Sequence, residues 1–390
     1  MSRVATGLDQ MVASGFKAWK GRRVGLIANP TSVDARLRHL ADLLHATPNV
    51  HLMALFGPEH GIRADAQDMI GVDSHDDPIT GIPVFSLYGD DVAALAPKRE
   101  WLEMLDLLIF DVQDIGTRYY TFAWTMLYAM RVAAEAGLSF TVLDRPNPIG
   151  GTLIEGPSIE PGFISFVGAH SIPTRHGLTV GELALLLRNE CRLDLDLQVF
   201  ACSDYRRTMT WTETGLPWVM PSPNMPTLDT ALVYPGGCLI EGTNLSEGRG
   251  TTRPFELWGA PWLDGHRLAA ELGLPGLHLR PCAFRPTFHK HAGQVCHGCQ
   301  PHVTDPAAFR PLAAYTALLA AARAQDPDRF TWRTEPYEFV RDPIAIDLLF
   351  GSSQVRKAIE DGVLARDIAS SWSNHEAEFA SRRAPYLLYK

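Results

Sequence analysis

LDLLIF at residues 105–110, followed by DVQDIGTRYY at residues 111–120, is the stretch that decides the fold. The first part is short and almost wholly apolar, as expected of a strand that is buried on both faces of a sheet. The second part is rich in acids, tyrosines and other polar residues. A helical stretch over residues 121–136 ends at Gly137, a residue typical of the position after a helix. Strand, polar loop and helix in this order predict one unit of an open α/β sheet.

The same alternation extends to both sides of this stretch. Further strands are expected at residues 22–29, 50–56, 84–87 and 139–143, and further helices at residues 34–46 and 97–104. Short apolar strands that alternate with helices predict a Rossmann-like parallel sheet with helices on both faces. Neither G-x-G-x-x-G nor the P-loop pattern occurs, so we expect this fold without a nucleotide and without any cofactor.

The remainder of the chain predicts a second domain. A helix is expected over residues 179–191, where Thr179 and Glu182 form a capping box. The proline-rich stretch 218–226 predicts an extended strap, and we place a domain boundary near Leu228. The predicted domains are therefore residues 1–228 and residues 229–390. Within the second, residues 311–324 and 353–372 are expected to be helical, and residues 284–303 to form strands and long loops.

Composition excludes several classes of protein. The formal net charge of the 390 residues is −9, which argues against a partner held by nucleic-acid phosphates. No apolar run approaches the ~20 residues that span a bilayer, so no membrane partner is expected. The N-terminus shows no secretory signal pattern, and the six cysteines are irregularly spaced. We therefore expect a cytoplasmic protein with reduced thiols.

Polar segments begin where predicted strands end. They cover residues 55–61, 111–120 and 144–148, and a glycine-rich segment at residues 241–253 lies far downstream. Because open α/β sheets place their sites at the carboxyl ends of the strands, the first three segments are expected to meet at one edge. Their acids, amides and arginines suit a polar, hydroxyl-rich ligand.

Glu59 and His60 follow Gly57-Pro58 at the end of a predicted strand. Glu59 is predicted to be a catalytic carboxylate, because burial can raise a glutamate pKa to a value useful for a general acid. His60 would position it or the substrate. A solvated turn is the alternative.

The next two loops carry further candidates. Asp111, Gln113 and Asp114 could hydrogen-bond sugar hydroxyls, and Arg118 could pair with an anionic group of the substrate. The alternatives are a structural salt bridge between Asp111 and Arg118, and core tyrosines at 119 and 120. Arg145 and Asn147 lie in a loop stiffened by prolines, which could equally be a plain turn.

The glycine-rich segment contains Glu241, Asn244, Glu247, Arg249 and Arg253. Closely spaced glycines let a backbone approach a ligand, and a mobile lid is the alternative. A third possibility concerns metal, because histidines and cysteines gather further downstream. A zinc site would draw on His289, His291, Cys296, His297, Cys299 and His302. With a single C-x-x-C pair, we predict no metal ligands.

These motifs together resemble the DUF1343 family, whose characterised members are the NamZ exo-β-N-acetylmuramidases. The matching segments are residues 25–31, 56–61, 110–122, 143–151, 224–227, 234–236, 241–253 and 288–290. The resemblance runs from about Arg22 to Lys390. It implies a Rossmann-like N-terminal domain, a smaller α/β C-terminal domain and a cleft between them. There, non-reducing-end N-acetylmuramic acid would be released from muropeptide or other peptidoglycan fragments.

The resemblance also implies residue roles. The catalytic glutamate of the family falls on Glu59, and the other polar residues fall on the segments around Asp111, Arg118, Asn147, Glu241 and Arg249. Many relatives look exported, whereas this chain shows no signal, which would place it in cell-wall recycling. The predicted catalytic residues are Glu59, Asp111 and Glu241. The predicted substrate-binding residues are His60, Gln113, Asp114, Arg118, Tyr119, Arg145, Asn147, Asn224, Asn244, Glu247, Arg249 and Arg253.

Glycoside hydrolysis commonly uses two carboxyl groups that flank the scissile bond. With Glu59 as general acid, the second group could be Asp111, Asp114, Glu241, Glu247 or the acetamido group of the substrate. The lactyl carboxylate of muramic acid requires a cation, for which Arg118, Arg249 and Arg253 are the candidates. Three rivals remain: a non-catalytic binder of cell-wall saccharides, a nucleotide-sugar enzyme and a metal hydrolase.

Overall fold

The computed structural model describes residues 3–59, 61–63, 75–89, 92–337 and 340–390. Its first lobe is built on a seven-stranded sheet with the order β3-β4-β2-β1-β5-β6-β7. Every pair in the sheet is parallel except β3 with β4. The strands are β1 (Arg23–Ala28), β2 (His51–Gly57), β3 (His75–Asp76), β4 (Pro83–Ser86), β5 (Leu107–Asp111), β6 (Ser139–Leu143) and β7 (Leu197–Phe200). The predicted Rossmann-like sheet is confirmed, although β3 and β7 were not expected.

Helices cover both faces of this sheet, as the buried strands predicted. In β5, Leu108 and Phe110 face one core, whereas Leu107 and Ile109 face the other. The first core contains α4 (Phe122–Ala136) and α5 (Val180–Glu190), which contact β6. The second contains α1 (Gly7–Ser14) and α2 (Leu40–His45). Since successive strand residues point to opposite faces, a wholly apolar strand fills two cores at once.

The helices predicted from capping signals are confirmed. Helix α4 ends at Gly137, which adopts a left-handed conformation with φ 65°. Helix α5 begins after Thr179, whose side chain accepts a hydrogen bond from the backbone of Glu182 in a capping box. In both cases the local residues supply the hydrogen bonds or the backbone freedom that a helix end needs.

The helix predicted over residues 34–46 is wrong in its first half. Only α2 forms, because the Asp34 carboxylate accepts hydrogen bonds from the backbone of Arg36 and Arg38 and holds a turn there. The helix predicted at 97–104 is reduced to α3 (Arg99–Leu102). The stretch at 353–372 is divided at Gly362, which has φ 75°, into α11 (Gln354–Glu360) and α12 (Ala365–Ser370).

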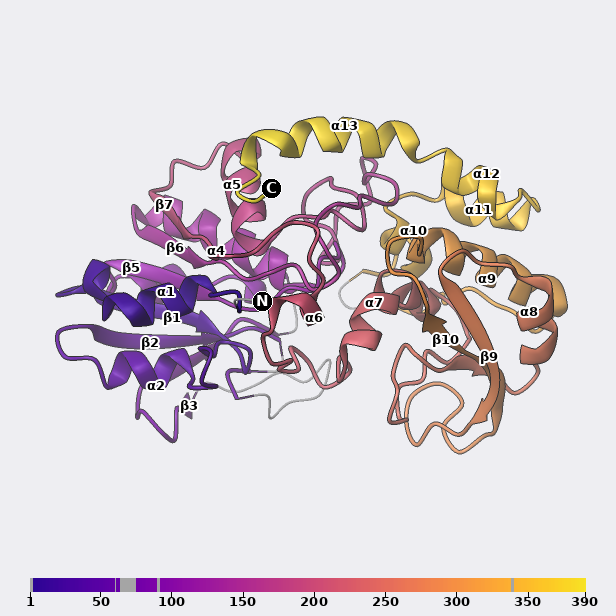
Figure 1. Ribbon diagram of the computed structural model, residues 1–390, viewed down its shortest axis with the longest axis horizontal. Coiled ribbons are helices and arrows are strands. Elements are labelled where there is room, and N and C mark those ends of the chain that lie inside the picture. The colour runs from indigo at the N-terminus through magenta and orange to yellow at the C-terminus, as the bar shows by residue number, and fades with distance from the viewer. Residues whose placement is uncertain (1–2, 60, 64–74, 90–91, 338–339) are drawn as a thin grey trace.

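The second lobe has a three-stranded antiparallel sheet with the order β8-β10-β9. Its strands are β8 (Trp258–Ala260), β9 (Leu277–Phe284) and β10 (Cys296–Val303). Its helices include α7 (Leu228–Gly237), α8 (Gly265–Glu271), α9 (Pro311–Gln325) and α10 (Ala345–Phe350). The prediction of a smaller α/β region is confirmed, and α7 packs against α9 (Figure 1). We infer that this lobe begins with α7.

The C-terminus returns to the first lobe. Helix α13 (Ser373–Arg383) bridges the two lobes and continues into the short helix η4 (Ala384–Tyr386), which contacts α5 (Figure 1). The Tyr389 hydroxyl donates a hydrogen bond of 2.5 Å to the Asp144 carboxylate, which follows β6. The chain therefore crosses between the lobes twice.

Four other short helices connect the main elements. They are η1 (Lys17–Trp19), η2 (Val92–Leu95), α6 (Trp211–Thr214) and η3 (Cys238–Gly242). None of the helices in the described ranges combines the length and apolar character needed to cross a membrane.

Candidate active site

A pocket lies between the two lobes. Both lobes contribute to its walls. The first lobe and the segment that follows it supply Glu59, Tyr119, Tyr120, Thr121, Phe122, Phe166, Val167, Ser222, Asn224 and Met225. The second lobe supplies Tyr234, Glu241, Arg249, Phe255, His289, Arg333 and Tyr337.

Glu59 enters the pocket from the loop that follows β2. Gly61 closes this loop, with φ 78° and a backbone hydrogen bond of 2.9 Å to the carbonyl of Pro58. The Thr121 hydroxyl donates to Glu59 Oε2 at 3.2 Å. Thr121 is the N-cap residue of α4, but its side chain makes no capping hydrogen bond to the helix. Its hydroxyl orients the Glu59 carboxylate instead. His60 lies outside the described residues.

Glu241 faces the same pocket from η3 of the second lobe. It is buried, and both of its carboxylate oxygens accept hydrogen bonds. Arg249 Nη2 donates to Oε1 at 2.8 Å, and the Tyr337 hydroxyl donates to Oε2 at 2.6 Å. Charge-assisted bonds to both oxygens fix the orientation of this carboxylate.

Glu247 supports this wall from behind and does not line the pocket. Its oxygens lie 3.0 Å from His289 Nδ1 and 3.0 Å from Lys290 Nζ, and 3.4 Å from Arg249 Nε. Burial alone would raise the pKa of Glu247, but Lys290, His289 and Arg249 together hold it well below its ordinary value. Glu247 is thus an anion that anchors the cations around it.

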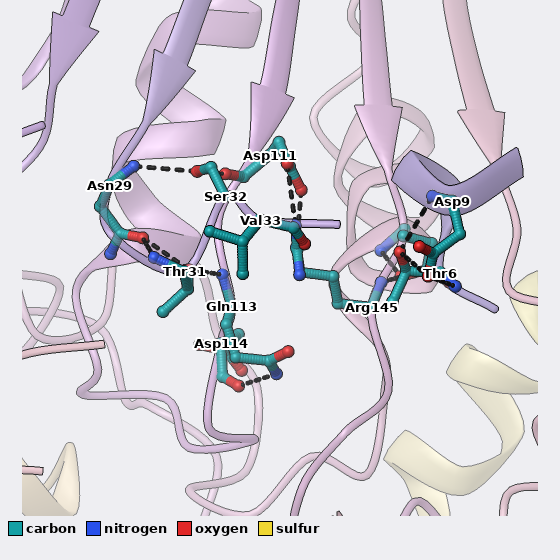
Figure 2. Close-up of polar contacts among 12 residues, drawn as sticks. Thr6, Asp9, Asn29, Thr31, Ser32, Val33, Asp111, Gln113, Asp114 and Arg145 are labelled. Carbon is teal, nitrogen blue, oxygen red and sulfur yellow. Dashed lines mark hydrogen bonds and ion pairs between the residues drawn. The ribbon is translucent and has the colours of Figure 1, made fainter. Parts of the chain in front are cut away.

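The crevice between β1 and β5 is where ligands bind in many open α/β sheets, because the strand order reverses there. In this chain its polar residues bind one another (Figure 2). Arg145 donates to both Asp111 oxygens, at 2.6 and 2.9 Å, and both residues are buried. The Gln113 backbone donates to Thr31 Oγ1 at 2.9 Å, and its side chain donates to the carbonyl of Pro146 at 2.9 Å.

Asp111, Gln113 and Arg145 therefore do not reach the pocket. The structural salt bridge considered for Asp111 exists, but with Arg145 in place of Arg118. The pocket at this crevice is smaller than the pocket between the lobes. The space is limited because a buried, bidentate ion pair occupies the crevice.

Arg118 is fully buried and away from the pocket. Its guanidinium donates to the carbonyls of Pro157 at 3.1 Å, Ile172 at 2.9 Å and Leu349 at 2.5 Å. These three carbonyls belong to segments far apart in the chain. Arg118 therefore joins the two lobes and does not present its charge to a ligand.

Asp114 and Asn147 are also buried, and their side chains bind backbone groups of the protein interior. Asp114 accepts a hydrogen bond of 2.6 Å from the backbone of Gly116, and burial raises its pKa to about 7. The Asn147 side chain donates to the carbonyl of Leu178 at 3.0 Å. Tyr119 does line the pocket, although its hydroxyl donates to the carbonyl of Pro235 in α7 and burial raises its pKa well above the ordinary value.

Two family models divide the chain between them. Residues 24–229 match the N-terminal part of the exo-β-N-acetylmuramidase NamZ, and residues 232–389 match its C-terminal part. The chain belongs to the NamZ family. The peptidoglycan β-N-acetylmuramidase NamZ of Bacillus subtilis (strain 168) is 45% identical over 390 residues, covering 99% of this chain and 92% of the relative.

Solved structures of the family share the fold. Two DUF1343 family proteins from Bacteroides fragilis NCTC 9343 superpose with TM-scores of 0.87 and 0.78, at 36% and 31% identity. Both matches cover 100% of this chain and 99% of the other. The family resemblance seen in the sequence is thereby confirmed over the whole chain.

The NamZ-family pocket contains residues that the sequence motifs did not single out. Arg333 and Tyr337 lie beyond α9, in a stretch with no periodic pattern, and His289 was given a role only as a zinc ligand, although it lies in the matching segment 288–290. Tyr120 was considered only as a core residue, yet it lines the pocket. No local signal marks Arg333 or Tyr337, because Arg333 is placed by the hydrogen bond of its backbone to Gly242 and Tyr337 by its hydrogen bond to Glu241, both made in the tertiary structure.

In the glycine-rich segment, Asn244 and Arg253 lie outside the pocket lining. The Asn244 side chain donates to the carbonyl of Arg329 at 2.7 Å, and Arg253 pairs with Glu256 at 3.2 Å. The glycines approach protein backbone, not an open ligand site. A Cβ at Gly250 would lie 2.7 Å from the backbone nitrogen of Phe288, and Gly250 has φ 79°. The loop thus packs on the segment that carries His289.

Within the described ranges, no group of three histidine, cysteine, aspartate or glutamate side chains is arranged to hold a metal. Cys296 and Cys299 both lie on β10. Residues three apart on a strand point to opposite faces, which separates these two thiols. Cys299 Sγ instead contacts the carbonyl of Gly265 at 3.3 Å.

Proposed function

We propose that this chain is a glycoside hydrolase that releases N-acetylmuramic acid from the non-reducing end of peptidoglycan-derived saccharides. The B. subtilis relative at 45% identity is named for β-N-acetylmuramidase activity on peptidoglycan. One structural observation carries the proposal for this chain. Among the described residues, Glu59 and Glu241 are the carboxylates that line the pocket between the lobes. Two carboxyl groups at one pocket are the usual equipment for hydrolysis of a glycosidic bond.

In the proposed mechanism, Glu59 is the general acid that protonates the oxygen of the leaving sugar. Its loop is held by the turn at Gly61 and its carboxylate by Thr121, so the acid is oriented before the substrate arrives. A positioned acid avoids the entropic cost of bringing a proton donor to the bond. Cleavage leaves a free hydroxyl on the departing sugar.

We assign the second carboxyl role to Glu241. Hydrogen bonds from Arg249 and Tyr337 hold its carboxylate in place at the pocket, where we expect it to activate water or stabilise an oxocarbenium-like transition state. Of the other carboxylates considered, Asp111 is paired with Arg145, Glu247 is bound by its cations, and Asp114 is buried away from the pocket. Aromatic side chains, including Tyr234 and Phe255, line the remaining wall.

The test is release of a chromogenic group from its β-N-acetylmuraminide, with the matched β-N-acetylglucosaminide run in parallel. Glu59→Gln should lower kcat by about 10³-fold or more, a loss typical of a missing general acid. Its melting temperature should stay close to that of the wild type, because the glutamine keeps the shape of the side chain. Glu335→Gln, at an exposed position near Arg333, is the matched control and should retain activity.

Turnover of the muraminide by the wild type and its loss in Glu59→Gln would support the proposal. Wild-type rates in Glu59→Gln would remove Glu59 from the mechanism. Binding of the muraminide without product, in the wild type and in Glu59→Gln alike, would show a saccharide-binding protein and overturn the proposed hydrolysis.

A further inference from the structure

The arginines near the pocket differ in how their charges are used. Arg118 is buried against three carbonyls, and Arg253 pairs with Glu256 outside the pocket. Arg249 lines the pocket, but its guanidinium binds Glu241 and Glu247. None of the three candidates from the sequence is therefore placed to offer its charge to a substrate carboxylate. The other arginine that lines the pocket is Arg333.

The backbone around Arg333 is attached to the wall that carries Glu241. The Arg333 amide donates to the carbonyl of Gly242 at 2.9 Å, and Trp332 forms a bridge with Thr243. One residue further, the Asn244 side chain accepts from the amide of Thr331 at 3.1 Å. These contacts place the Arg333 side chain beside the pocket from a segment that is distant in sequence.

The Arg333 guanidinium is oriented by a backbone carbonyl and an aromatic ring. Its Nη2 donates to the carbonyl of Pro336 at 2.9 Å, and its Cζ lies 5.2 Å from the centre of the Tyr337 ring. No carboxylate in the described part of the chain lies within ion-pair distance of it. An arginine has five N–H donors in a planar fork, of which one contact to Pro336 occupies only one.

We propose that Arg333 binds the lactyl carboxylate of N-acetylmuramic acid and determines the preference for it over N-acetylglucosamine. This assignment rests on the proposed function. The lactyl ether is the group that distinguishes the two sugars, and its carboxylate matches the guanidinium fork in charge and geometry. N-acetylglucosamine carries a neutral hydroxyl at that position and offers no anion to Arg333.

Tyr337 connects this contact to the chemistry. Its ring supports the Arg333 guanidinium, and its hydroxyl donates to Glu241 Oε2 at 2.6 Å. A substrate held by its lactyl carboxylate on Arg333 is thereby placed next to the carboxylate that we assign as the second catalytic group. Selectivity and positioning then arise from the same wall of the pocket.

Calorimetry with two free sugars tests the assignment without relying on turnover. The probes are N-acetylmuramic acid and its lactyl methyl ester, which differ in one negative charge. The wild type should bind the acid about 10- to 100-fold more tightly than the ester, as expected for a hydrogen-bonded ion pair. Arg333→Met should bind the two with equal affinity, and Arg333→Lys should recover part of the preference because it restores the charge without the fork.

Arg329→Met is the matched control, because Arg329 lies in the same segment with an exposed side chain paired to Asp326. It should keep the full preference for the acid. A preference for the acid that survives in Arg333→Met would overturn the assignment. Melting curves of both Arg333 variants establish that a lost preference comes from the side chain and not from unfolding.

Kinetics distinguish this assignment from the proposed function. In Arg333→Met, kcat/KM for the muraminide should fall by about 10- to 100-fold, while kcat/KM for its methyl ester stays near the wild-type value. If the wild type cleaves the muraminide and Arg333→Met does so equally well, the Arg333 assignment fails and the hydrolase remains. If the wild type cleaves nothing but prefers the acid through Arg333, the hydrolase proposal fails and the Arg333 assignment stands.

Discussion

The crevice between β1 and β5 and the pocket between the lobes are both rich in acids and arginines, but they use them differently. In the crevice, Asp111 and Arg145 are buried and bind each other through two hydrogen bonds. In the pocket, Arg249 orients Glu241 while both line the open space, and Arg333 has no carboxylate partner among the described residues. The comparison teaches that a charged motif at a strand end identifies an edge of the sheet, not the site itself.

The largest expected effect is on stability, and it tests whether the ion pair in the crevice between β1 and β5 is structural. Asp111→Asn should lower the free energy of unfolding by about 3–5 kcal/mol, because it leaves the Arg145 charge buried without its partner. Asp106, just before the start of the same strand, pairs with Arg23 at the surface. Asp106→Asn should therefore change the free energy of unfolding by about 1 kcal/mol or less. Both values come from denaturant unfolding followed by circular dichroism.

The activity of the Asp111 variant sharpens the comparison. If the crevice is structural, kcat per folded molecule should remain near the wild-type value in Asp111→Asn. A stable Asp111→Asn protein with a lost kcat would instead return Asp111 to the catalytic residues and place the chemistry in the crevice.

The next effect concerns the pocket. Glu241→Gln should lower kcat for the muraminide by about 100-fold, because the amide cannot activate water or stabilise positive charge as a carboxylate does. Glu271→Gln, in an exposed pair with Arg267, is the control and should change neither kcat nor KM. A kcat within a few-fold of the wild type in Glu241→Gln would favour the acetamido group of the substrate as the second catalytic group.

The effect that is smallest per pH unit is a pH dependence of stability. Burial raises the pKa of Asp114 to about 7, so the folded state binds a proton that the unfolded chain has released above about pH 4. Stability from Asp114 therefore falls as the pH rises from about 4 to 7, by up to about 1.4 kcal/mol per pH unit. Asp114→Asn cannot ionise and should lose this slope.

The slope is measured as the difference in unfolding free energy between the wild type and Asp114→Asn at several pH values. Burial lowers the pKa of the nearby His176 to about 3, so its contribution rises with pH between about 3 and 6.5, opposite in sign. His176 is present in both proteins, and its contribution cancels in the difference to first order. Parallel pH profiles of the two proteins would contradict a neutral Asp114 in the fold.

Much of the fold was predictable from local residues. The apolar stretch at 107–110 specifies a strand with a core on each face, and Thr179 and Gly137 mark helix ends by capping and by backbone freedom. The prediction failed where a side chain altered the local pattern or where the pattern was weak. Asp34 holds a turn at residues that have helical apolar spacing, and β7 lacks a pattern strong enough to identify it.

The candidate site was predictable in part. Glu59, Tyr119, Asn224, Glu241 and Arg249 were expected in a site, and all line the pocket, whereas their roles remain predictions. Asp111, Gln113, Asp114, Arg118, Arg145 and Asn147 were also expected in a site, but the structure places them in the interior of the first lobe or between the lobes. Composition alone could not separate the two sets, since both contain acids, amides, arginines and aromatic residues.

The sequence by itself determined the parallel sheet, the polar loops at its carboxyl edge and the family, because strands, caps and turns depend on neighbouring residues. Only the tertiary structure decided which charges satisfy one another and which face the pocket. Arg145 meets Asp111 across 34 residues of sequence, and Arg333 reaches the wall of Glu241 through the backbone of Gly242. A guanidinium can offer its charge to a ligand only if folding does not bring a carboxylate next to it. The distance between the two groups in the folded chain is not encoded in any local sequence pattern.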